Sequence, residues 1–106
     1  MNPEAIEKLI DQGRDSYEAR LAAGQARLKA GDLVRAIEHL EVATGHRPDQ
    51  TMAWQELGKA LNESARPEAA RTAWEKGLEA ARANGDKQAE KVIGVFLKRL
   101  DRQAQG

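Results

Sequence analysis

The chain has 106 residues, 17 of them basic and 17 acidic, and it contains no cysteine. Disulfides, thiol catalysis and thiolate metal sites are therefore excluded. The balanced charge does not indicate binding to nucleic acid or to an anionic membrane, and it does not specify a partner. The first residues include several acidic side chains and no long apolar segment follows, so we expect one cytoplasmic domain without a signal peptide or membrane span.

The first predicted helix covers residues 3–12. Asn2 is placed to cap it, and Pro3 suits its first turn because the missing N–H of proline would have no partner there. Three apolar residues at helical spacing form one stripe: Ile6, Leu9 and Ile10. A helix this short is not stable alone, so we expect it to cover the helices that follow.

The second predicted helix covers residues 15–30. Asp15 and Glu18 have the spacing of a capping box, so we expect Asp15 to cap this helix. The helix should end near Gly31, because glycine readily adopts the left-handed conformation that closes many helices.

The third predicted helix covers residues 33–45. Asp32 is placed to cap it. We expect Gly45 to end it, and Pro48 cannot continue it. The inner face of this helix is apolar, which predicts that it packs against the helix before it.

The next two helices are predicted over residues 50–63 and 67–83, as an antiparallel pair. Apolar and small residues form one stripe on each: Trp54, Leu57, Gly58 and Leu61, then Ala70, Trp74, Gly77 and Leu78. Pro67 suits the first turn of the second helix. Ala65 stands in the turn between them, where a residue with positive φ would be informative.

The last predicted helix covers residues 86–103, with Asp86 as its cap. Its apolar stripe comprises Ile93, Phe96, Leu97 and Leu100. Charged residues flank this stripe, as expected of a helix that is apolar inside and solvated outside. We therefore predict a closing helix that covers the end of a repeat array.

The sequence repeats itself with a spacing of 34 residues. The matched pairs are Gly58 with Gly24, Ala60 with Ala26, Ala70 with Ala36 and Glu75 with Glu41. These positions resemble the tetratricopeptide repeat (TPR), whose pattern begins W-x2-L-G-x2-Y. One copy is matched by Trp54, Leu57, Gly58, Leu61 in place of Tyr, Ala70, Trp74 and Gly77, and the copy before it by Gly24, Ala36, Leu40, Ala43 and Pro48.

The first copy departs from the pattern in its first helix. Arg20, Ala23 and Arg27 stand where the family has Trp, Leu and Tyr. We therefore expect this helix to pack more loosely than its counterpart in the second copy. Similarity to short bacterial two-repeat TPR proteins implies an all-α fold in which antiparallel hairpins form a right-handed superhelix. The implied divisions of one domain over 1–106 are a half-repeat helix (1–13), repeat 1 (14–48), repeat 2 (49–85) and a capping helix with its tail (86–106).

The resemblance also implies a binding surface. In the family, the first helices of successive repeats line a concave groove that holds partner peptides or helices. In this sequence the corresponding groove residues are Glu18, Leu21, Gln25, Leu28, Lys29, Met52, Gln55, Lys59, Asn62 and Glu63. Leu21 and Leu28 have an alternative role as ordinary core residues that compensate for Arg20 and Arg27. The exposed fraction of the two leucine side chains distinguishes the groove role from the core role.

No catalytic constellation emerges from the residues. His39 and His46 are interpreted as exposed polar residues, and the carboxylates as solvent-facing, rather than as metal or acid–base sites. Trp54 and Trp74 are assigned to core packing rather than to stacking on a ligand.

The predicted function is that of a non-enzymatic protein–protein interaction module with no cofactor or metal. Its partner is a protein or peptide, not nucleic acid or membrane, and the chain itself is expected to be a monomer. The alternative is a structural or assembly subunit that self-associates through its irregular first repeat.

Overall fold

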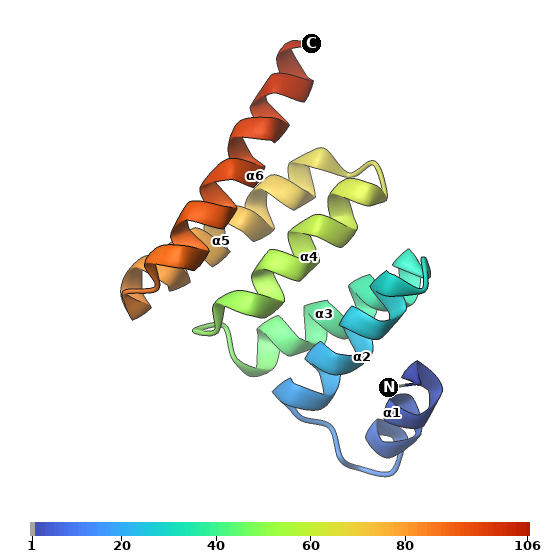
Figure 1. Ribbon diagram of the computed structural model, residues 1–106. Coiled ribbons are helices and arrows are strands. Elements are labelled where there is room, and N and C mark those ends of the chain that lie inside the picture. Colours follow the sequence, from blue (N-terminus) through green and yellow to red (C-terminus); the bar gives the residue numbers. More distant parts are fainter. Residues whose placement is uncertain (1) are drawn as a thin grey trace.

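The computed structural model describes residues 2–106, and across them the chain is helical with short connections and no strand (Figure 1). The helices are α1 (Pro3–Asp11), α2 (Tyr17–Lys29), α3 (Leu33–His46), α4 (Thr51–Glu63), α5 (Pro67–Asn84) and α6 (Lys87–Gln105). Each lies within about two residues of its predicted bounds. The prediction of an all-α chain is therefore confirmed.

Consecutive helices pack side by side as antiparallel pairs. Contacts join α2 to α3, α3 to α4, and α4 to α5, while α1 packs on α2 and α6 packs on α5. In Figure 1, α2, α4 and α6 follow one another along one face, with α3 and α5 behind them. The chain is therefore a short stack with one extra helix at each end.

Three of the predicted helix caps are confirmed. The side-chain oxygens of Asn2, Asp32 and Asp86 accept hydrogen bonds from backbone N–H groups in the first turns of α1, α3 and α6. Each bond satisfies a donor that the helix itself leaves without a partner.

The prediction that Asp15 caps α2 is wrong. The cap is Ser16, whose Oγ accepts a hydrogen bond from the N–H of Ala19 at 3.1 Å. The carboxylate of Asp15 instead accepts two hydrogen bonds from the guanidinium of Arg20, at 2.8 and 2.9 Å. A bidentate charged pair is stronger than a cap bond, so it decides where the Asp15 side chain lies.

The prediction that Gly45 ends α3 is also wrong. The helix continues to His46, and the N–H of Arg47 still bonds to the carbonyl of Ala43 at 3.1 Å. The helix ends at Arg47 because the ring of Pro48 clashes with a helical residue before it. Arg47 accordingly leaves the helical region, with φ −138° and ψ 78°.

The turn between α4 and α5 has a positive φ at Ala65, of 59°. The N–H of Arg66 reaches back to the carbonyl of Leu61 at 2.9 Å and closes the turn. The equivalent turn between α2 and α3 has Gly31, with φ 82°. Ala65 therefore adopts a conformation that costs a residue with a side chain more than it costs glycine.

The main core lies among α3, α4, α5 and α6. Its larger members are Ile37, Leu40, Leu57, Leu61, Trp74, Ile93 and Leu100. Trp74 is 3% exposed, which confirms its predicted core position, and its ring centroid lies 5.2 Å from that of Phe96, so it lies between the second hairpin and the closing helix. Trp54 packs at the edge of this core, half-buried, and its Nε1–H donates to the carbonyl of Pro48 at 2.9 Å.

Small residues permit this packing, as the sequence predicted. A Cβ atom on Gly58 would lie 2.3 Å from Nε1 of Trp74, and one on Gly24 would lie 2.6 Å from Cγ of Leu40. Both distances are far below van der Waals contact. Glycine at these two positions lets paired helices approach closely enough to enclose large side chains.

A second, smaller core holds α1 against α2. It consists of Ile6, Ile10 and Ala23, with Ala19 and Ala22 beside them. This confirms that the first helix covers the first hairpin.

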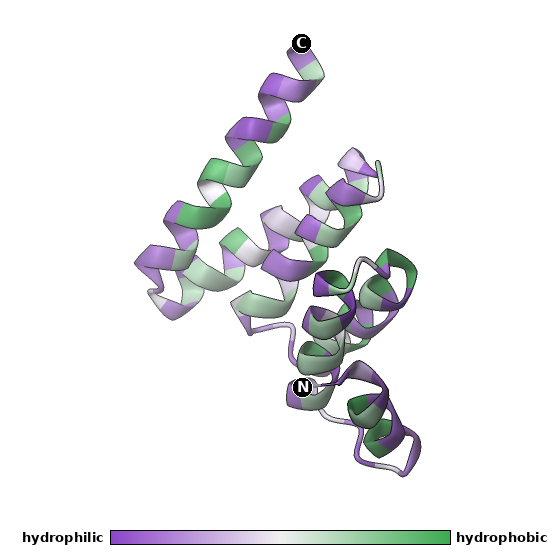
Figure 2. Cartoon of the chain, turned by 45° about the vertical axis from the view of Figure 1, so that its right-hand side comes forward, coloured by the Kyte–Doolittle hydropathy of each residue, from purple (hydrophilic) through white to green (hydrophobic). Residues whose placement is uncertain are grey.

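Figure 2 shows polar and apolar residues sharing the surface of every helix. None of the described helices is long and apolar enough to cross a membrane.

Candidate functional site

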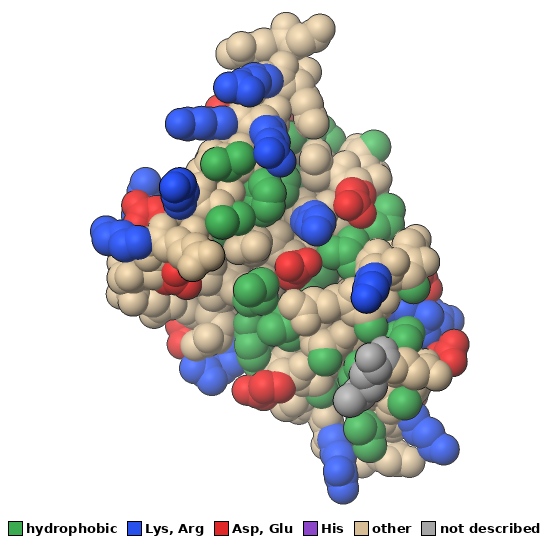
Figure 3. Space-filling view, in the orientation of Figure 1, with side chains coloured by type: hydrophobic (Ala, Val, Ile, Leu, Met, Phe, Trp, Pro, Cys, Tyr) green, Lys and Arg blue, Asp and Glu red, His purple; other side chains and the backbone are tan. Residues whose placement is uncertain are grey.

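The face along which α2, α4 and α6 follow one another holds most of the candidate binding residues. We call it the front face and define it by the solvent-facing side chains of these three helices (Figure 3). The predicted groove residues lie on α2 and α4, which supply one half of the set each. The two halves differ in what they line.

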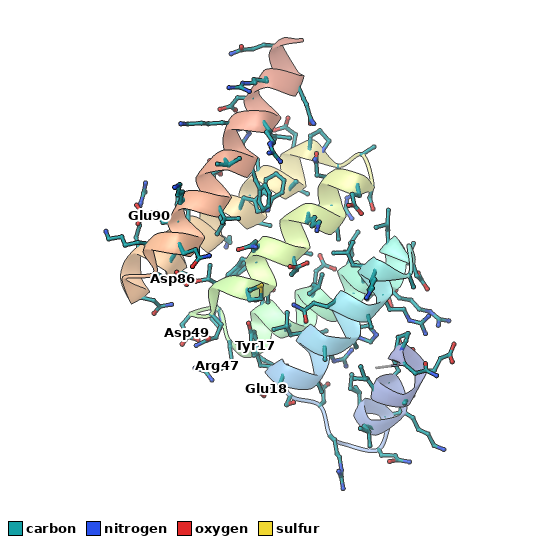
Figure 4. All side chains as sticks on the ribbon, in the orientation of Figure 1. Tyr17, Glu18, Arg47, Asp49, Asp86 and Glu90 are labelled. Atoms are coloured by element: carbon teal, nitrogen blue, oxygen red, sulfur yellow. The ribbon has the colours of Figure 1, made fainter. Side chains whose placement is uncertain are left out.

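The α2 half is closed rather than hollow. Glu18, Gln25 and Lys29 are exposed, whereas Leu21 and Leu28 are half-buried and pack against the main core. The two leucines therefore combine the two alternative roles, because each touches the core and leaves an edge at the surface. At the start of α2, Tyr17 is half-buried between this helix and α4, beside the labelled Glu18 in Figure 4. Burial raises its pKa, an effect that the nearby backbone of Ala53 opposes.

The α4 half lines two hollows that this helix forms with α6. The N-terminal hollow, of about 400 Å³, lies between the starts of the two helices and is lined by Gln50, Thr51, Met52, Gln55, Asn84, Asp86 and Ala89. The C-terminal hollow, of about 250 Å³, lies between their ends and is lined by Lys59, Asn62, Glu63, Trp74, Phe96, Arg99, Leu100 and Gln103. All five predicted groove residues of α4 therefore line a hollow with α6.

These hollows exist because α4 and α6 both pack on α5 and hardly touch each other. Trp74 of α5 reaches between them and meets Phe96 of α6, so the C-terminal hollow has an aromatic floor. The Nε1–H of Trp74 donates to the carbonyl of Gln55 at 3.1 Å, which satisfies its buried polar atom. The floor is therefore fixed by the core and does not depend on a ligand.

The exposure of the α4 residues suits contact with another molecule. Met52 is 44% exposed and so offers an apolar side chain at the surface beside the N-terminal hollow. Lys59 and Glu63 are exposed, and the amides of Gln55 and Asn62 are half-buried. This part of the front face thus offers apolar surface, hydrogen-bonding amides and charge together.

Sequence reasoning missed the contribution of α6. Ala89, Phe96, Arg99 and Gln103 line the hollows, but Phe96 was assigned only to the core stripe and the others to no site. Their spacings of seven, three and four residues place them on one side of a helix, and this pattern was readable. The sequence alone does not show that this side of α6 faces α4 across a gap.

One carboxyl of the front face has a pKa above its ordinary value. Burial raises the pKa of Glu56 on α4, and the nearby Glu63 adds to this effect while Lys59 opposes it. Catalysis would require a second group positioned against it, and Glu56 makes no side-chain hydrogen bond or ion pair within residues 2–106. The raised pKa therefore reflects a half-buried carboxyl rather than an assembled acid–base pair.

A chain of ionic contacts joins α1, α2 and α3 elsewhere in the molecule. Glu7 accepts a hydrogen bond from Nε of Arg27 at 3.0 Å, and its Oε2 lies 2.7 Å from Nε2 of His39. These contacts lower the pKa of Glu7 from 4.5 to about 2, chiefly through the hydrogen bond with Arg27 and then that with His39. His39 is 9% exposed, so its predicted exposed position is wrong, as is the solvent-facing assignment of Glu7.

The same chain of contacts continues to the loop before α2. Nη1 of Arg20 lies 3.1 Å from Nδ1 of His39, and Arg20 also holds Asp15. Nε2 of His46 lies 3.0 Å from Oδ1 of Asp15. Arg20 and His46 lower the pKa of Asp15 well below its ordinary value. We call the six residues Glu7, Asp15, Arg20, Arg27, His39 and His46 the ionic network.

The ionic network explains why arginine can replace large apolar residues in α2. Arg27 is 8% exposed and Arg20 is half-buried, yet both guanidinium groups meet carboxylates. We predicted looser packing of α2 because arginines stand at its apolar positions. Helix α1 offsets this effect, since it brings the carboxylate of Glu7 to Arg27. No three His, Asp or Glu side chains within residues 2–106 are placed to hold a metal ion. The arrangement supports a structural role.

Comparison with known proteins shows the family to which the chain belongs. No family model matches it. It is 43% identical over 99 residues to the TPR repeat-containing protein PA0015 of Pseudomonas aeruginosa, across 93% of this chain and 94% of that protein. The chain belongs to the tetratricopeptide repeat family. Among solved structures, it is similar to the solution structure of protein BPP2914 from Bordetella parapertussis, with a TM-score of 0.81 and 37% identity over 95% of this chain and 88% of that one.

Family membership confirms the predicted TPR fold. The hairpins α2–α3 and α4–α5 are TPR hairpins, and α1 and α6 are single helices at either end of the stack. The similarity covers nearly the whole chain, so it includes the irregular first hairpin as well as the well-matched second one. The front face includes α2 and α4, the first helices of these two hairpins.

Proposed function

We propose that this TPR protein is a non-enzymatic protein–protein interaction module that binds a partner segment along its front face. The proposal includes the groove set predicted from the sequence and the division of the chain into one half-repeat, two repeats and a capping helix. It further holds that the protein acts as a cytoplasmic monomer. The hollows between α4 and α6 are the observation that supports it most.

The side chains along α4 suit a peptide partner. Amides such as Gln55 and Asn62 can both donate to and accept from a peptide backbone. The unbranched thioether of Met52 adapts to apolar side chains of different shape. An interface that combines apolar surface with a few hydrogen bonds is typical of reversible protein recognition.

An enzymatic function has less support. The carboxyls with the lowest pKa values, Glu7 and Asp15, are occupied by cations in the ionic network and line none of the hollows described above. Glu56 has a raised pKa, and its side chain makes no hydrogen bond or ion pair within residues 2–106. Active sites combine a pocket with several polar groups that converge on one point. These three carboxyls do not converge in a hollow, so the structure favours binding over catalysis.

Self-assembly through the first repeat also has less support. That alternative depends on an unprotected apolar side of the first hairpin. In the structure α1 covers this side with Ile6 and Ile10, which are 4% and 7% exposed, and the exposed apolar side chains left there are Leu9 and Val34, which stand singly at 40% and 71% exposed. We therefore retain the groove-binding function as the proposal.

The test is affinity capture from the native cell extract with two matched double variants. Gln55→Ala with Lys59→Ala removes two side chains from the front face, whereas Lys8→Ala with Gln12→Ala removes the same side-chain types from exposed positions beside α1. We expect the wild type and the α1 variant to retain the same partner and the α4 variant to lose it, with all three melting alike. Equal capture by all three would move the site away from the front face.

A further inference from the structure

The net charge of zero conceals an excess of positive charge at one end of the stack. Helix α6 contains five basic residues, Lys87, Lys91, Lys98, Arg99 and Arg102, and two acidic ones, Glu90 and Asp101. Both acids are already paired: Glu90 lies 3.4 Å from Arg82 and 3.8 Å from Lys87, and Asp101 lies 2.8 Å from Arg71. The other four cations make no ion pair with any residue from 2 to 106.

Part of this excess faces the C-terminal hollow. Arg99 of α6 lines it from one side and Lys59 of α4 from the other, and Lys59 also lacks an ion pair among residues 2–106. Glu63 is the only carboxylate among the residues that line the hollow. Figure 3 shows Lys and Arg side chains gathered along α6 beside an apolar patch. Two cations that make no ion pair within residues 2–106 therefore flank one opening.

Between these cations the hollow is apolar. Phe96 is half-buried, and Leu100 and Trp74 lie beneath the surface at 3% exposed each. A neighbouring hollow of about 380 Å³ shares Asn62, Leu100 and Gln103 with it and continues toward the start of α5. The two together provide more room than a single side chain requires.

We propose that the C-terminal hollow selects acidic partner segments in which a large apolar side chain is flanked by Asp or Glu. The apolar side chain packs against Phe96 and Leu100, and the carboxylates pair with Arg99 and Lys59. This inference rests on the proposed function and specifies the chemistry of its partner. Arginine is suited to the role because its guanidinium can hold a carboxylate by two parallel hydrogen bonds.

The two parts of the hollow would contribute differently. Burial of the apolar side chain supplies most of the affinity, since it removes apolar surface from water on both sides. The cations supply selectivity and speed of association, because unlike charges across an interface favour the correct partner and like charges reject the wrong one. Binding should consequently weaken as salt screens the exposed pairs.

A protein segment fits this hollow better than a phosphate-bearing partner. Nucleic-acid-binding surfaces stack bases on exposed aromatic rings, whereas Trp74 is buried beneath the hollow. An anionic bilayer requires a broad cationic surface, and Glu63 together with the half-buried Glu56 interrupts the positive charge next to Lys59. A single apolar side chain with neighbouring carboxylates matches both the size and the charge.

The experiment selects 12-residue peptides from a random phage-displayed library on the intact protein. The charge-reversal variant Lys59→Glu with Arg99→Glu tests the hollow. Its control, Lys8→Glu with Arg14→Glu, reverses one exposed lysine and one exposed arginine that lie outside the predicted groove set and line none of the hollows described above. Melting curves of both variants show whether each is folded, and Lys59→Gln with Arg99→Gln replaces the first variant if it is not.

We expect the selected peptides to combine Leu, Phe or Trp with adjacent Asp or Glu. A synthetic peptide of this type should bind at least roughly tenfold more weakly to the Lys59/Arg99 variant, a difference of about 1.4 kcal/mol, and equally well to the control. Its affinity for the wild type should fall as sodium chloride is raised.

Other outcomes overturn the inference. Selected peptides without acidic residues that are lost on Met52→Glu would keep the front-face function but exclude the acidic partner. Loss of binding on the Lys8/Arg14 control would place the site on α1 or the connection that follows it. Tighter binding of an anionic phospholipid vesicle or a single-stranded oligonucleotide than of any selected peptide would assign the cations to phosphate. Failure to select any peptide would overturn both this inference and the proposed function.

Discussion

The contact between Gly58 and Trp74 shows how much a single atom matters in this core. The absence of a Cβ at Gly58 leaves room for the indole, which in turn fills the space between α4, α5 and α6. Close-packed interiors tolerate additional volume poorly because neighbouring side chains have no alternative position. The second hairpin is therefore sensitive to added volume at Gly58, although alanine has a higher helix propensity than glycine.

Gly58→Ala should lower the free energy of unfolding by about 1–3 kcal/mol, because the new methyl group overlaps the indole. The control is Gly94→Ala, where a Cβ meets no atom within 4 Å in the middle of α6. That change should raise stability by about 0.5–1 kcal/mol through helix propensity. Urea denaturation of both variants checks the prediction, and equal shifts would show that the indole yields to the methyl group.

Ala65→Gly should leave stability unchanged or raise it by up to about 1 kcal/mol. Relief of the left-handed backbone favours glycine, while the greater freedom of glycine in the unfolded chain opposes it. Ala83→Gly, in the helical backbone of α5, serves as the control and should lose about 1 kcal/mol. Thermal melting of the pair measures the difference. A loss at residue 65 as large as that at residue 83 would contradict strain at this turn.

Glu7 makes the stability of the protein depend on acid pH. Pairing lowers its pKa in the folded state, so its contribution is complete above the ordinary value of 4.5 and is lost as the pH falls from there toward 2. Glu7→Gln should therefore be less stable than the wild type at pH 6, and the gap should narrow at pH 3. Glu38→Gln on the exposed side of α3 is the control. A constant gap between Glu7→Gln and the wild type would exclude this ion pair as its cause.

Single residues also mark where prediction from sequence stopped. The caps at Asn2, Asp32 and Asp86 were predictable because a cap depends on a few neighbouring residues. Asp15 and His39 were not, because Asp15 is held by Arg20 together with His46 of α3, and His39 of α3 meets Glu7 of α1. Residue type and local spacing do not specify contacts between elements distant in the sequence.

At the scale of the elements, the helices were predictable and the space between them was not. Apolar spacing and the internal repeat located six helices and their pairing. The gap between α4 and α6 depends on how far Trp74 and Phe96 hold the two helices apart, which spacing along one helix does not encode. The sequence therefore identified the α4 side of the candidate site and missed the α6 side.

The two end helices protect the stack by different means. Helix α1 buries few apolar side chains and relies also on the ionic network, whereas α6 packs Ile93 and Leu100 into the main core. Repeat arrays need such end helices because each repeat buries its apolar side only against a neighbour. In this protein the closing helix additionally supplies one wall of the candidate site.

The whole molecule is an elongated stack with extents of 44 × 30 × 19 Å and an uneven distribution of charge. Its ends are covered by α1 and α6, which leave Leu9 and Val95 as single exposed apolar side chains of 40% exposure each, so growth by further stacking has little apolar surface to begin from. The excess of cations on α6 also disfavours contact between two copies through that helix.

We accordingly expect a monomer. Multi-angle light scattering from low to high micromolar concentration should return a constant mass near 11.7 kDa. A mass that doubles with concentration would restore the self-association alternative. Repeating the measurement at high salt separates repulsion between cationic ends from a true lack of affinity.

Whether the hollows between α4 and α6 receive the partner is tested most directly by mapping its contacts. The partner segment obtained by affinity capture is titrated into uniformly ¹⁵N-labelled protein, and the backbone amide shifts are followed by NMR. The proposed function predicts that the largest shifts fall within residues 52–63 and 89–103, with α1 and the outer sides of α3 and α5 unchanged. Largest shifts on α3 and α5 would contradict it and place the binding surface on the opposite face.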